Sequence, residues 1–187
     1  MMEVTQFWNL VEEVKQEAGI DPDERAACLK DKLLSLTPEQ VAAFQFWFDK
    51  AFNRADHWDL WGAAYVIGGG CSDDGFMDFR AWLISEGREH FEQALEDADS
   101  MADWELPEYC EAESYAYAAQ EAFEELGGED IEEAVAELDI HEEDQDEEED
   151  YQGTRGEPWE EEDLEERFPR LSERFAYTEE HGASEDD

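Results

Sequence analysis

The sequence predicts an all-α protein in which a compact multi-helix domain carries an acidic, partly disordered C-terminal extension. Apolar residues recur at helical spacing through most of the first 127 residues. Residues typical of helix starts precede several of these stretches. No stretch alternates apolar and polar residues for long enough to predict a strand, so a β-hairpin has room only in the loops.

Helix-start signals divide the N-terminal third into three amphipathic helices. Thr5 is the expected cap of the first, whose apolar face ends at Gly19. Asp21 followed by Pro22 starts the second, because an aspartate cap with proline at the first helical position is a favoured combination. The sequence TPEQ at residues 37–40 is a capping box and opens the third.

A fourth helix is expected in the stretch WDLWGAAYVIGGG, residues 58–70. Asp56 and Asp59 are its expected start. The three glycines stop it, since a glycine run costs too much conformational entropy in a helix interior. Its apolar residues surround the helix on all sides, which predicts a central position in the fold.

Ser72 or Asp73 is the expected cap of the next helix, which runs to about Gly87. A short helical continuation is predicted around residues 91–95. The sequence AESYAYAAQEAFEEL then predicts a helix over residues 112–126.

Charge divides the chain further. The 56 acids and 12 bases give a net charge of -44, and residues 89–154 contain no Lys or Arg. Residues 129–150 hold 14 acids in 22 positions, a composition typical of solvated chain. We therefore expect a helical core domain over residues 1–127, an acidic flexible tether over 128–157, and a short aromatic helical segment with an acidic tail over 158–187.

The last of these segments regains large apolar side chains. They are Trp159, Leu164, Phe168, Leu171 and Phe175, and the same stretch contains arginines 167, 170 and 174. A disordered tail has no physical need for such anchors. The segment is therefore expected either to dock on its own core or to serve as bait for a partner.

Composition excludes several classes of function. A strongly negative field repels nucleic acids and anionic membranes, so neither direct nucleic-acid binding nor membrane binding is expected. The N-terminus lacks the features of a signal peptide, and the three cysteines are widely spaced, as expected for free thiols of a cytoplasmic protein. No cofactor motif is present, since the glycine run lacks both the Walker lysine and the GxGxxG spacing.

The block WDLWGAAYVIGGGCSDDGFMDFRAWLISEGRE, residues 58–89, closely resembles the signature of a bacterial family known as domain of unknown function 4240. Gly68 stands where that signature has an asparagine. The resemblance extends over most of the chain, through an N-terminal FW helix, the stretch ALEDADSMADW, a Tyr- and Ala-rich helix and a late Trp followed by DL and FPRL. The resemblance implies a mainly helical, soluble protein, and it carries over no reaction and no catalytic residues.

The turn GGCSDDG is the strongest candidate for a chemical site. Cys71 lies near a helix N-terminus, which lowers the pKa of a thiol, but Asp73 and Asp74 lie close to it and favour the neutral form. His57 is the histidine nearest this block and a candidate base. Asp73 and Asp74 are also candidate ligands of a hard cation, or ordinary capping residues of the next helix.

Three functions remain open at this point. The leading prediction is a non-enzymatic protein-protein interaction or regulatory module with a basic protein partner. The first alternative is a metal-dependent or cysteine enzyme that uses the GGCSDDG turn. The second is an acidic DNA mimic that inhibits a basic nucleic-acid-binding protein. The acidity is also consistent with adaptation to high salt.

Overall fold

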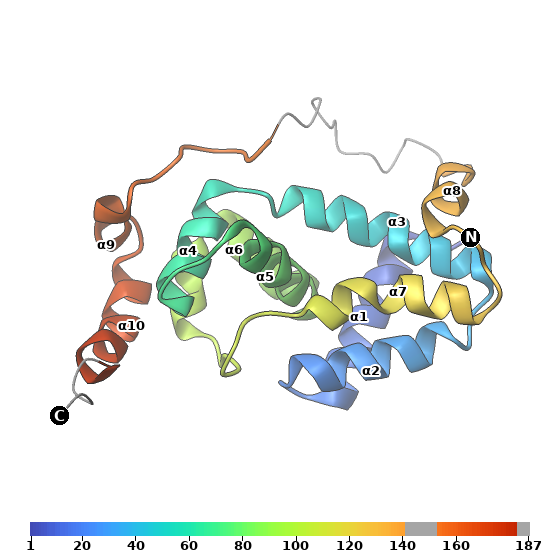
Figure 1. Ribbon diagram of the computed structural model, residues 1–187, viewed down its shortest axis with the longest axis horizontal. Helices are drawn as coiled ribbons and strands as arrows, with labels where there is room; N and C mark the ends of the chain where they lie inside the picture. The colour runs from blue at the N-terminus through green and yellow to red at the C-terminus, as the bar shows by residue number, and fades with distance from the viewer. Residues whose placement is uncertain (141–152, 183–187) are drawn as a thin grey trace.

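The computed structural model describes residues 1–140 and 153–182, with side chains described through residue 175 (Figure 1). These residues form helices and no strand, and one isolated bridge pairs His57 with Arg155. The predicted all-α class is therefore confirmed for this part of the chain. The densest part of the predicted acidic tether, residues 141–152, and the end of the predicted acidic tail, residues 183–187, lie outside the described residues.

From α1 to η1 the helices follow one another along the chain with connections of one to four residues, and longer segments precede α7 and η3. The α-helices are α1 Val4–Ala18, α2 Pro22–Leu33, α3 Pro38–Arg54, α4 Trp58–Gly68, α5 Asp73–Ser85, α6 Arg88–Glu96, α7 Glu113–Glu125, α8 Ile131–Ala136, α9 Leu164–Arg167 and α10 Pro169–Gly182. Two short 3-10 helices are η1 Ala98–Asp103 and η3 Glu161–Asp163. Within the described ranges, no helix combines the length and apolarity needed to cross a membrane.

Several helix starts lie where the sequence predicts them. Asp21 caps α2 by accepting hydrogen bonds from the backbone N–H groups of its first turn. Thr37 and Gln40 form the predicted capping box of α3, with Gln40 Oε1 accepting from the Thr37 N–H at 3.1 Å. Ser72, rather than Asp73, caps α5 by accepting from the Gly75 N–H at 3.1 Å.

Two predicted starts are wrong. Helix α1 begins at Val4, before Thr5, because the Gln6 side chain reaches back to accept a hydrogen bond from the Glu3 N–H at 2.8 Å. Helix α4 is capped by His57 rather than by either flanking aspartate. The His57 ring accepts the free first-turn N–H of Asp59 at 3.2 Å, which is the role expected of a carboxylate.

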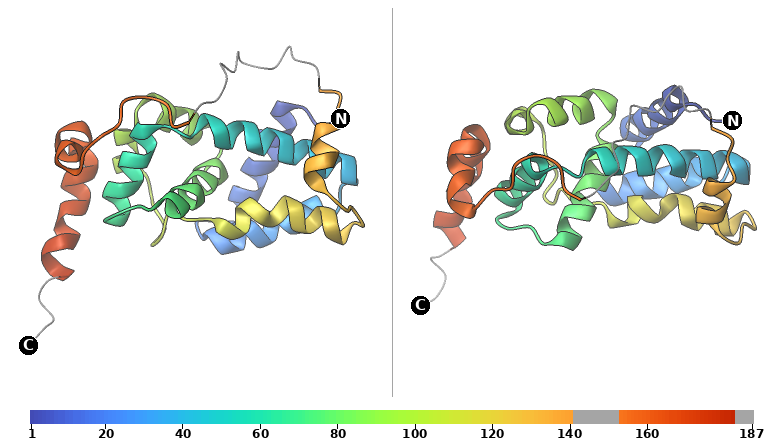
Figure 2. Two further views of the ribbon diagram at one scale, coloured as in Figure 1. Left: turned by 45° about the horizontal axis from the view of Figure 1, so that its top comes forward. Right: turned by 90° about the horizontal axis from the view of Figure 1, so that it is seen from above.

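Large aromatic side chains fill the centre of the protein. Helix α3 runs along the molecule and packs on α1, α5, α7 and α8, and α2 and α7 pack side by side (Figures 1 and 2). The Phe7 ring lies 4.9 Å from that of Trp8 and 5.0 Å from that of Phe44, measured between centroids. Offset and edge-on ring contacts of this kind favour a close-packed core. The aromatic stripes of the sequence therefore belong largely to the core.

Helix α4 lies near one end of the molecule and not at its centre. It packs against α5 and η1 on one side, and α10 covers another side (Figures 1 and 2). We call residues 153–182, which contain η3, α9 and α10, the C-terminal arm. The all-round apolar character of α4 thus reflects two partners on different faces, the helical core and the C-terminal arm.

A buried ion pair joins α2 to the end of α5. Arg25 is 2% exposed and donates to Glu86 Oε1 at 2.6 Å, to Ser85 Oγ at 3.1 Å and to the Gly19 carbonyl at 2.6 Å. Lys15 lies 3.5 Å from the second oxygen of Glu86. A buried guanidinium is tolerated only while such partners satisfy it.

Glu86→Ala is expected to destabilise the fold by about 3–5 kcal/mol, because it leaves the Arg25 charge buried without its carboxylate partner. Urea unfolding followed by circular dichroism measures the change. Glu17→Ala is the matched control, since Glu17 pairs with Lys32 at 2.8 Å on the surface and its removal is expected to have little effect. Equal effects of the two substitutions would contradict a special role for the buried pair.

Candidate functional site

The turn between α4 and α5 is built by glycine and by a serine cap. Gly69 has φ 67° and ψ 31°, the left-handed conformation that ends α4, and its neighbour Gly70 has φ 135°. The Trp61 indole N–H then donates to the Cys71 carbonyl at 3.1 Å, which ties the turn back to α4. Asp73 and Asp74 follow in the first turn of α5, where both are exposed and where carboxylates stabilise a helix start.

Cys71 lies in an environment that favours the neutral thiol. Burial, together with the carboxylates of Glu111, Asp78 and Asp73, raises the pKa of Cys71 to about 11. The thiol is therefore protonated at neutral pH, despite its place near the N-terminus of a helix. Sequence reasoning identified the effect of Asp73, whereas Glu111 approaches from a segment 40 residues away.

The acids around this turn influence one another through their charges. Burial and then the charges of Glu113, Glu111 and Asp74 raise the pKa of Asp78. No group of three His, Cys, Asp or Glu side chains in the described part of the chain is arranged to hold a metal ion. A metal role for Asp73 and Asp74, and a catalytic role for either of them or for Cys71, stay predictions.

His57 lies at the opposite end of α4 from Cys71. The 11 residues of the helix place the two ends about 15 Å apart at a rise of about 1.5 Å per residue. The His57 ring instead contacts the start of the C-terminal arm. A Cβ atom added at Gly156 would lie 2.5 Å from His57 Cε1, so the glycine is required for this close approach.

The C-terminal arm packs on α4 and η1 through apolar side chains. Leu164, Phe168 and Leu171 are 5%, 2% and 0% exposed. A Cβ atom added at Gly62 of α4 would lie 2.5 Å from Phe168 Cε2, so the phenyl ring lies directly against the bare helix backbone. Full burial of each such side chain contributes about 1.5–3 kcal/mol, before the conformational entropy lost on ordering the arm.

Carboxylates of α4 and η1 bind the polar groups of the C-terminal arm. Asp99 accepts hydrogen bonds from the backbone N–H groups of Arg170, at 3.2 Å, and Leu171, at 2.9 Å. These groups belong to the first turn of α10, which has no intrahelical acceptor for them, so Asp99 acts as a cap supplied from 71 residues away. Arg167 pairs with Asp59 at 2.8 Å, and Arg170 pairs with Asp103.

Further hydrogen bonds hold the start of the arm and the first half of α10. The Trp159 indole donates to the Trp58 carbonyl at 2.8 Å, and the Trp58 N–H donates to the Arg155 carbonyl at 2.8 Å. Within α10, Arg174 donates to the Ala102 carbonyl at 2.9 Å and the Trp104 carbonyl at 2.7 Å. The segment that was expected either to dock or to act as bait is therefore docked on its own core.

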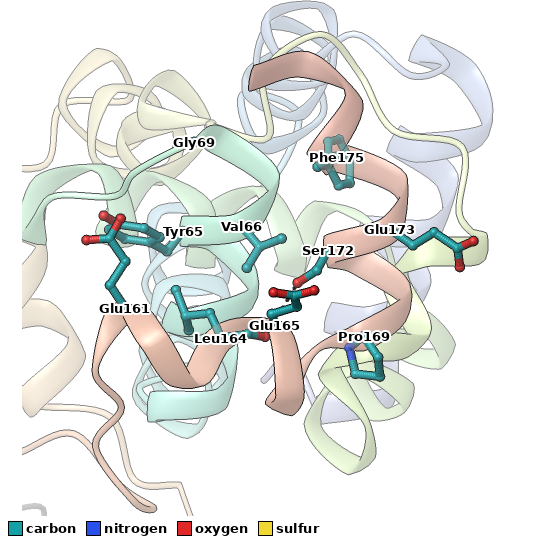
Figure 3. Close-up of a pocket in the computed structure, with 10 residues that line it drawn as sticks. All are labelled: Tyr65, Val66, Gly69, Glu161, Leu164, Glu165, Pro169, Ser172, Glu173 and Phe175. Carbon is teal, nitrogen blue, oxygen red and sulfur yellow. Dashed lines mark hydrogen bonds between the residues drawn. The ribbon is translucent and has the colours of Figure 1, made fainter. Parts of the chain in front are cut away.

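A groove of about 590 Å³ lies between α4 and the C-terminal arm (Figure 3). Its lining residues are Tyr65, Val66, Gly69, Glu161, Leu164, Glu165, Pro169, Ser172, Glu173 and Phe175. Apolar side chains cover much of this lining, the three glutamates are exposed, and none of the lining residues is a Lys or Arg. The groove therefore combines an apolar surface with carboxylates of a single sign.

Sequence reasoning missed the residues that receive the arm. It identified the late arginines and apolar anchors of the arm, but it predicted no element over Ala98–Asp103 and gave no role to Asp59, Gly62 or Asp99 beyond a possible helix start. The glycine in WGAAY was the available signal, because a glycine inside an apolar helix often marks a close approach of another segment.

We expect Cys71 to react slowly with iodoacetamide. At pH 8 a thiol with a pKa of about 11 holds on the order of 100-fold less thiolate than an unstructured cysteine with a pKa of about 8.5. Mass spectrometry of the labelled chain, with a cysteine-containing peptide in the same tube, measures the ratio of rates. Labelling of Cys71 as fast as the peptide would show an activated thiol and would favour the cysteine-enzyme alternative.

Asp78→Asn is expected to raise the melting temperature at pH 7. The pKa of Asp78 is higher in the folded state than its ordinary value of 3.8, so the folded state holds this proton more tightly and loses stability as the pH rises through the folded pKa. The difference in melting temperature between variant and wild type is expected to shrink as the pH falls below 3.8, the ordinary pKa of the group, where the carboxyl becomes protonated in both the folded and the unfolded state. Thermal unfolding of both proteins across this pH range measures the difference in melting temperature. A difference that is independent of pH would show that the charge of Asp78 is not what destabilises the fold.

Comparison with known proteins places the helical core in one family. The model of the family described as protein of unknown function (DUF4240) matches residues 2–125, which run from the N-terminus to the end of α7. Neither a curated protein nor a solved structure matches the chain. The match covers well over half of the sequence and includes the GGCSDDG turn, α4 and η1. The chain therefore belongs to the DUF4240 family of proteins of unknown function.

Proposed function

We propose that this protein is a non-enzymatic protein-protein interaction module that binds a basic protein partner in the groove between α4 and the C-terminal arm. The observation that carries the proposal is the combination of an apolar lining with Glu161, Glu165 and Glu173 (Figure 3). Lys and Arg side chains lay their apolar stems along such a surface while their charged heads reach carboxylates. The partner is therefore expected to present a Lys or Arg beside an apolar side chain.

The charge of the whole chain supports this choice of partner. The net charge is -44, and most of the few basic side chains already contact carboxylates within the protein, as Arg25, Arg54 and Arg167 do. The remaining acids produce a negative field that attracts a basic surface and speeds its encounter with the groove.

The groove also has a regulatory property, because its two walls come from different parts of the chain. Val66 belongs to α4, whereas Leu164 and Phe175 belong to the C-terminal arm. A partner that contacts both walls stabilises the docked position of the arm by its own binding energy. Binding and arm docking are thus coupled.

The test uses a photocrosslinking amino acid at Ser172 in the groove, with the same amino acid at Gln120 as the control. Gln120 is exposed on α7 and donates to Glu124 at 3.1 Å, so it samples an acidic surface away from the groove. In a lysate of the host organism, we expect a basic protein to crosslink at Ser172 and not at Gln120. The adduct is expected to fall at least about tenfold when Glu161, Glu165 and Glu173 are all changed to Gln.

Equal crosslinking at the two positions, or an adduct that survives the triple substitution, would show non-specific attraction and would contradict the proposal. If the crosslinked partner binds DNA and DNA competes for it, the groove partner would instead support the DNA-mimic alternative. Calorimetric titration of the purified partner into the full chain then gives the affinity of the groove.

A further inference from the structure

We propose that the face formed by α4 and η1 is a recognition surface for an arginine-bearing aromatic helix, and that the C-terminal arm is its resident ligand. A helix of a partner protein with the same pattern competes with the arm for this face. This inference goes beyond the groove, because it concerns the surface beneath the arm.

The contacts of the C-terminal arm are concentrated on two short stretches of the core. One is residues 56–59, which bind Arg155, Trp159 and Arg167. The other is residues 99–104, which bind the start of α10 and Arg174. Both stretches lie inside the region that matches the family, residues 2–125, whereas the arm lies outside it. We call the face formed by α4 and η1 the receptor face. It is part of the family domain, and its ligand, the C-terminal arm, follows that domain in the sequence.

The receptor face recognises a helix through its first turn. Asp99 is 9% exposed, and its two carboxylate oxygens accept the backbone N–H groups of Arg170 and Leu171. The free N–H groups and the positive end of the dipole are common to all helix N-termini, so this contact selects a helix start rather than a side chain. Pro169 at the first position of α10 fixes the backbone in the required conformation.

Side chains around Asp99 specify which helix fits. Gly62 leaves room for a flat ring against the α4 backbone, and Phe168, immediately before the proline, fills that space. Asp59 and Asp103 flank the site and pair with arginines one position before the ring and two positions after it. The expected ligand therefore has the pattern Arg-aromatic-Pro-Arg-Leu, as residues 167–171 do, followed by an arginine one turn later.

Recognition is local and not a matter of overall charge. Residues 167–175 contain three arginines and one glutamate, but the other acids make the C-terminal arm negative as a whole. Long-range repulsion between the arm and the acidic core opposes docking, while the short-range pairs at Asp59 and Asp103 favour it. A partner helix that carries the arginines without the surrounding acids avoids this repulsion.

Covalent linkage makes the arm a strong competitor. A tethered ligand acts at an effective concentration on the order of 1 mM, so a free helix binds the intact chain only after overcoming this advantage. Displacement of the arm also removes one wall of the groove. The groove partner and the competing helix therefore exclude one another.

The test cuts the connection without removing any residue. A specific protease site is inserted between residues 146 and 147 of the full chain, and the probe is a fluorescent synthetic peptide of residues 153–182. We expect the probe to bind the cleaved chain at least about tenfold more tightly than the intact chain, because cleavage ends the tethered competition. Circular dichroism before and after cleavage is expected to show that the helical core stays folded.

Two substitutions in the core test the geometry. Gly62→Ala is expected to weaken probe binding to the cleaved chain by at least about tenfold, because the added methyl group clashes with the Phe168 ring. A probe with Phe168→Ala lacks this ring and is expected to bind the wild-type and the Gly62→Ala chains with equal affinity. Asp99→Ala is expected to weaken binding by about 3- to 30-fold through loss of the cap. Asp130→Ala is the matched control, since Asp130 also caps a helix, accepting from the Glu132 and Glu133 N–H groups of α8, and α8 packs on α3 and α7. It is expected to leave the affinity unchanged.

Three results would overturn the inference. The first is that the cleaved arm never exchanges with the probe. The second is that its release unfolds residues 1–140, which would make the arm an integral part of the core. The third is that probe binding is indifferent to Gly62→Ala and Asp99→Ala. The peptide experiment tests the surface beneath the arm on the cleaved chain, whereas crosslinking at Ser172 tests the groove on the intact chain with its arm docked. A negative result in one experiment therefore leaves the other proposal to be judged by its own test.

Discussion

Phe168 packs against the backbone of α4 at Gly62, and Asp99 caps the helix that follows Phe168. These two contacts set the position of the whole C-terminal arm, because one fixes the depth of the ring and the other fixes the start of α10. With the arm in this position, Leu164 and Leu171 are buried, the arginines reach their carboxylates, and the groove acquires its second wall. The same contacts bring the arm against the side of α4 that faces away from the core, so the apolar residues on that side also have a packing partner.

The few basic residues of the protein are used mainly in contacts between its own helices. Lys and Arg are few, and those that are present largely bridge helices within the chain, as Arg25 does between α2 and α5 and Arg170 does between the arm and η1. The outward surface is left with carboxylates. In a protein organised in this way, specific ion pairs join helices that the apolar core also holds together. A field of this sign attracts basic surfaces and repels phosphate-rich ones in general.

Local sequence patterns predicted most of the helices. The capping box at Thr37 and the Asp21-Pro22 start involve residues within one turn of each other, so the pattern determines the contact. The two wrong helix starts also depend on local contacts. The Gln6 side chain bonds the Glu3 N–H, so α1 begins before Thr5, and the His57 ring takes the capping role expected of an aspartate. In both cases the group that caps the helix depends on a side-chain rotamer, which a residue pattern does not specify.

The candidate site was predictable only in part, for the same reason. Cys71 and Asp73 lie two positions apart, and the effect of the Asp73 charge on the thiol pKa followed directly from that spacing. The same effect expected of Asp74 stays a prediction. Glu111 and Asp99 act on residues 40 and 71 positions away, and no sequence pattern connects them with their targets. The apolar anchors of the arm predicted that the segment packs somewhere, whereas the identity of the receiving face depends on the folded core.

Hydrogen exchange of the first-turn amides of α10, followed by NMR on the full chain, tests the central claim most directly. Arg170 and Leu171 lie at positions where an isolated helix leaves its N–H groups open to water. A docked arm predicts protection of both amides, loss of that protection in Asp99→Ala, and retention of it in Asp130→Ala. Exchange of both amides in the wild-type chain at the rate of an unstructured peptide would contradict the docked arm, and with it the receptor face and the groove.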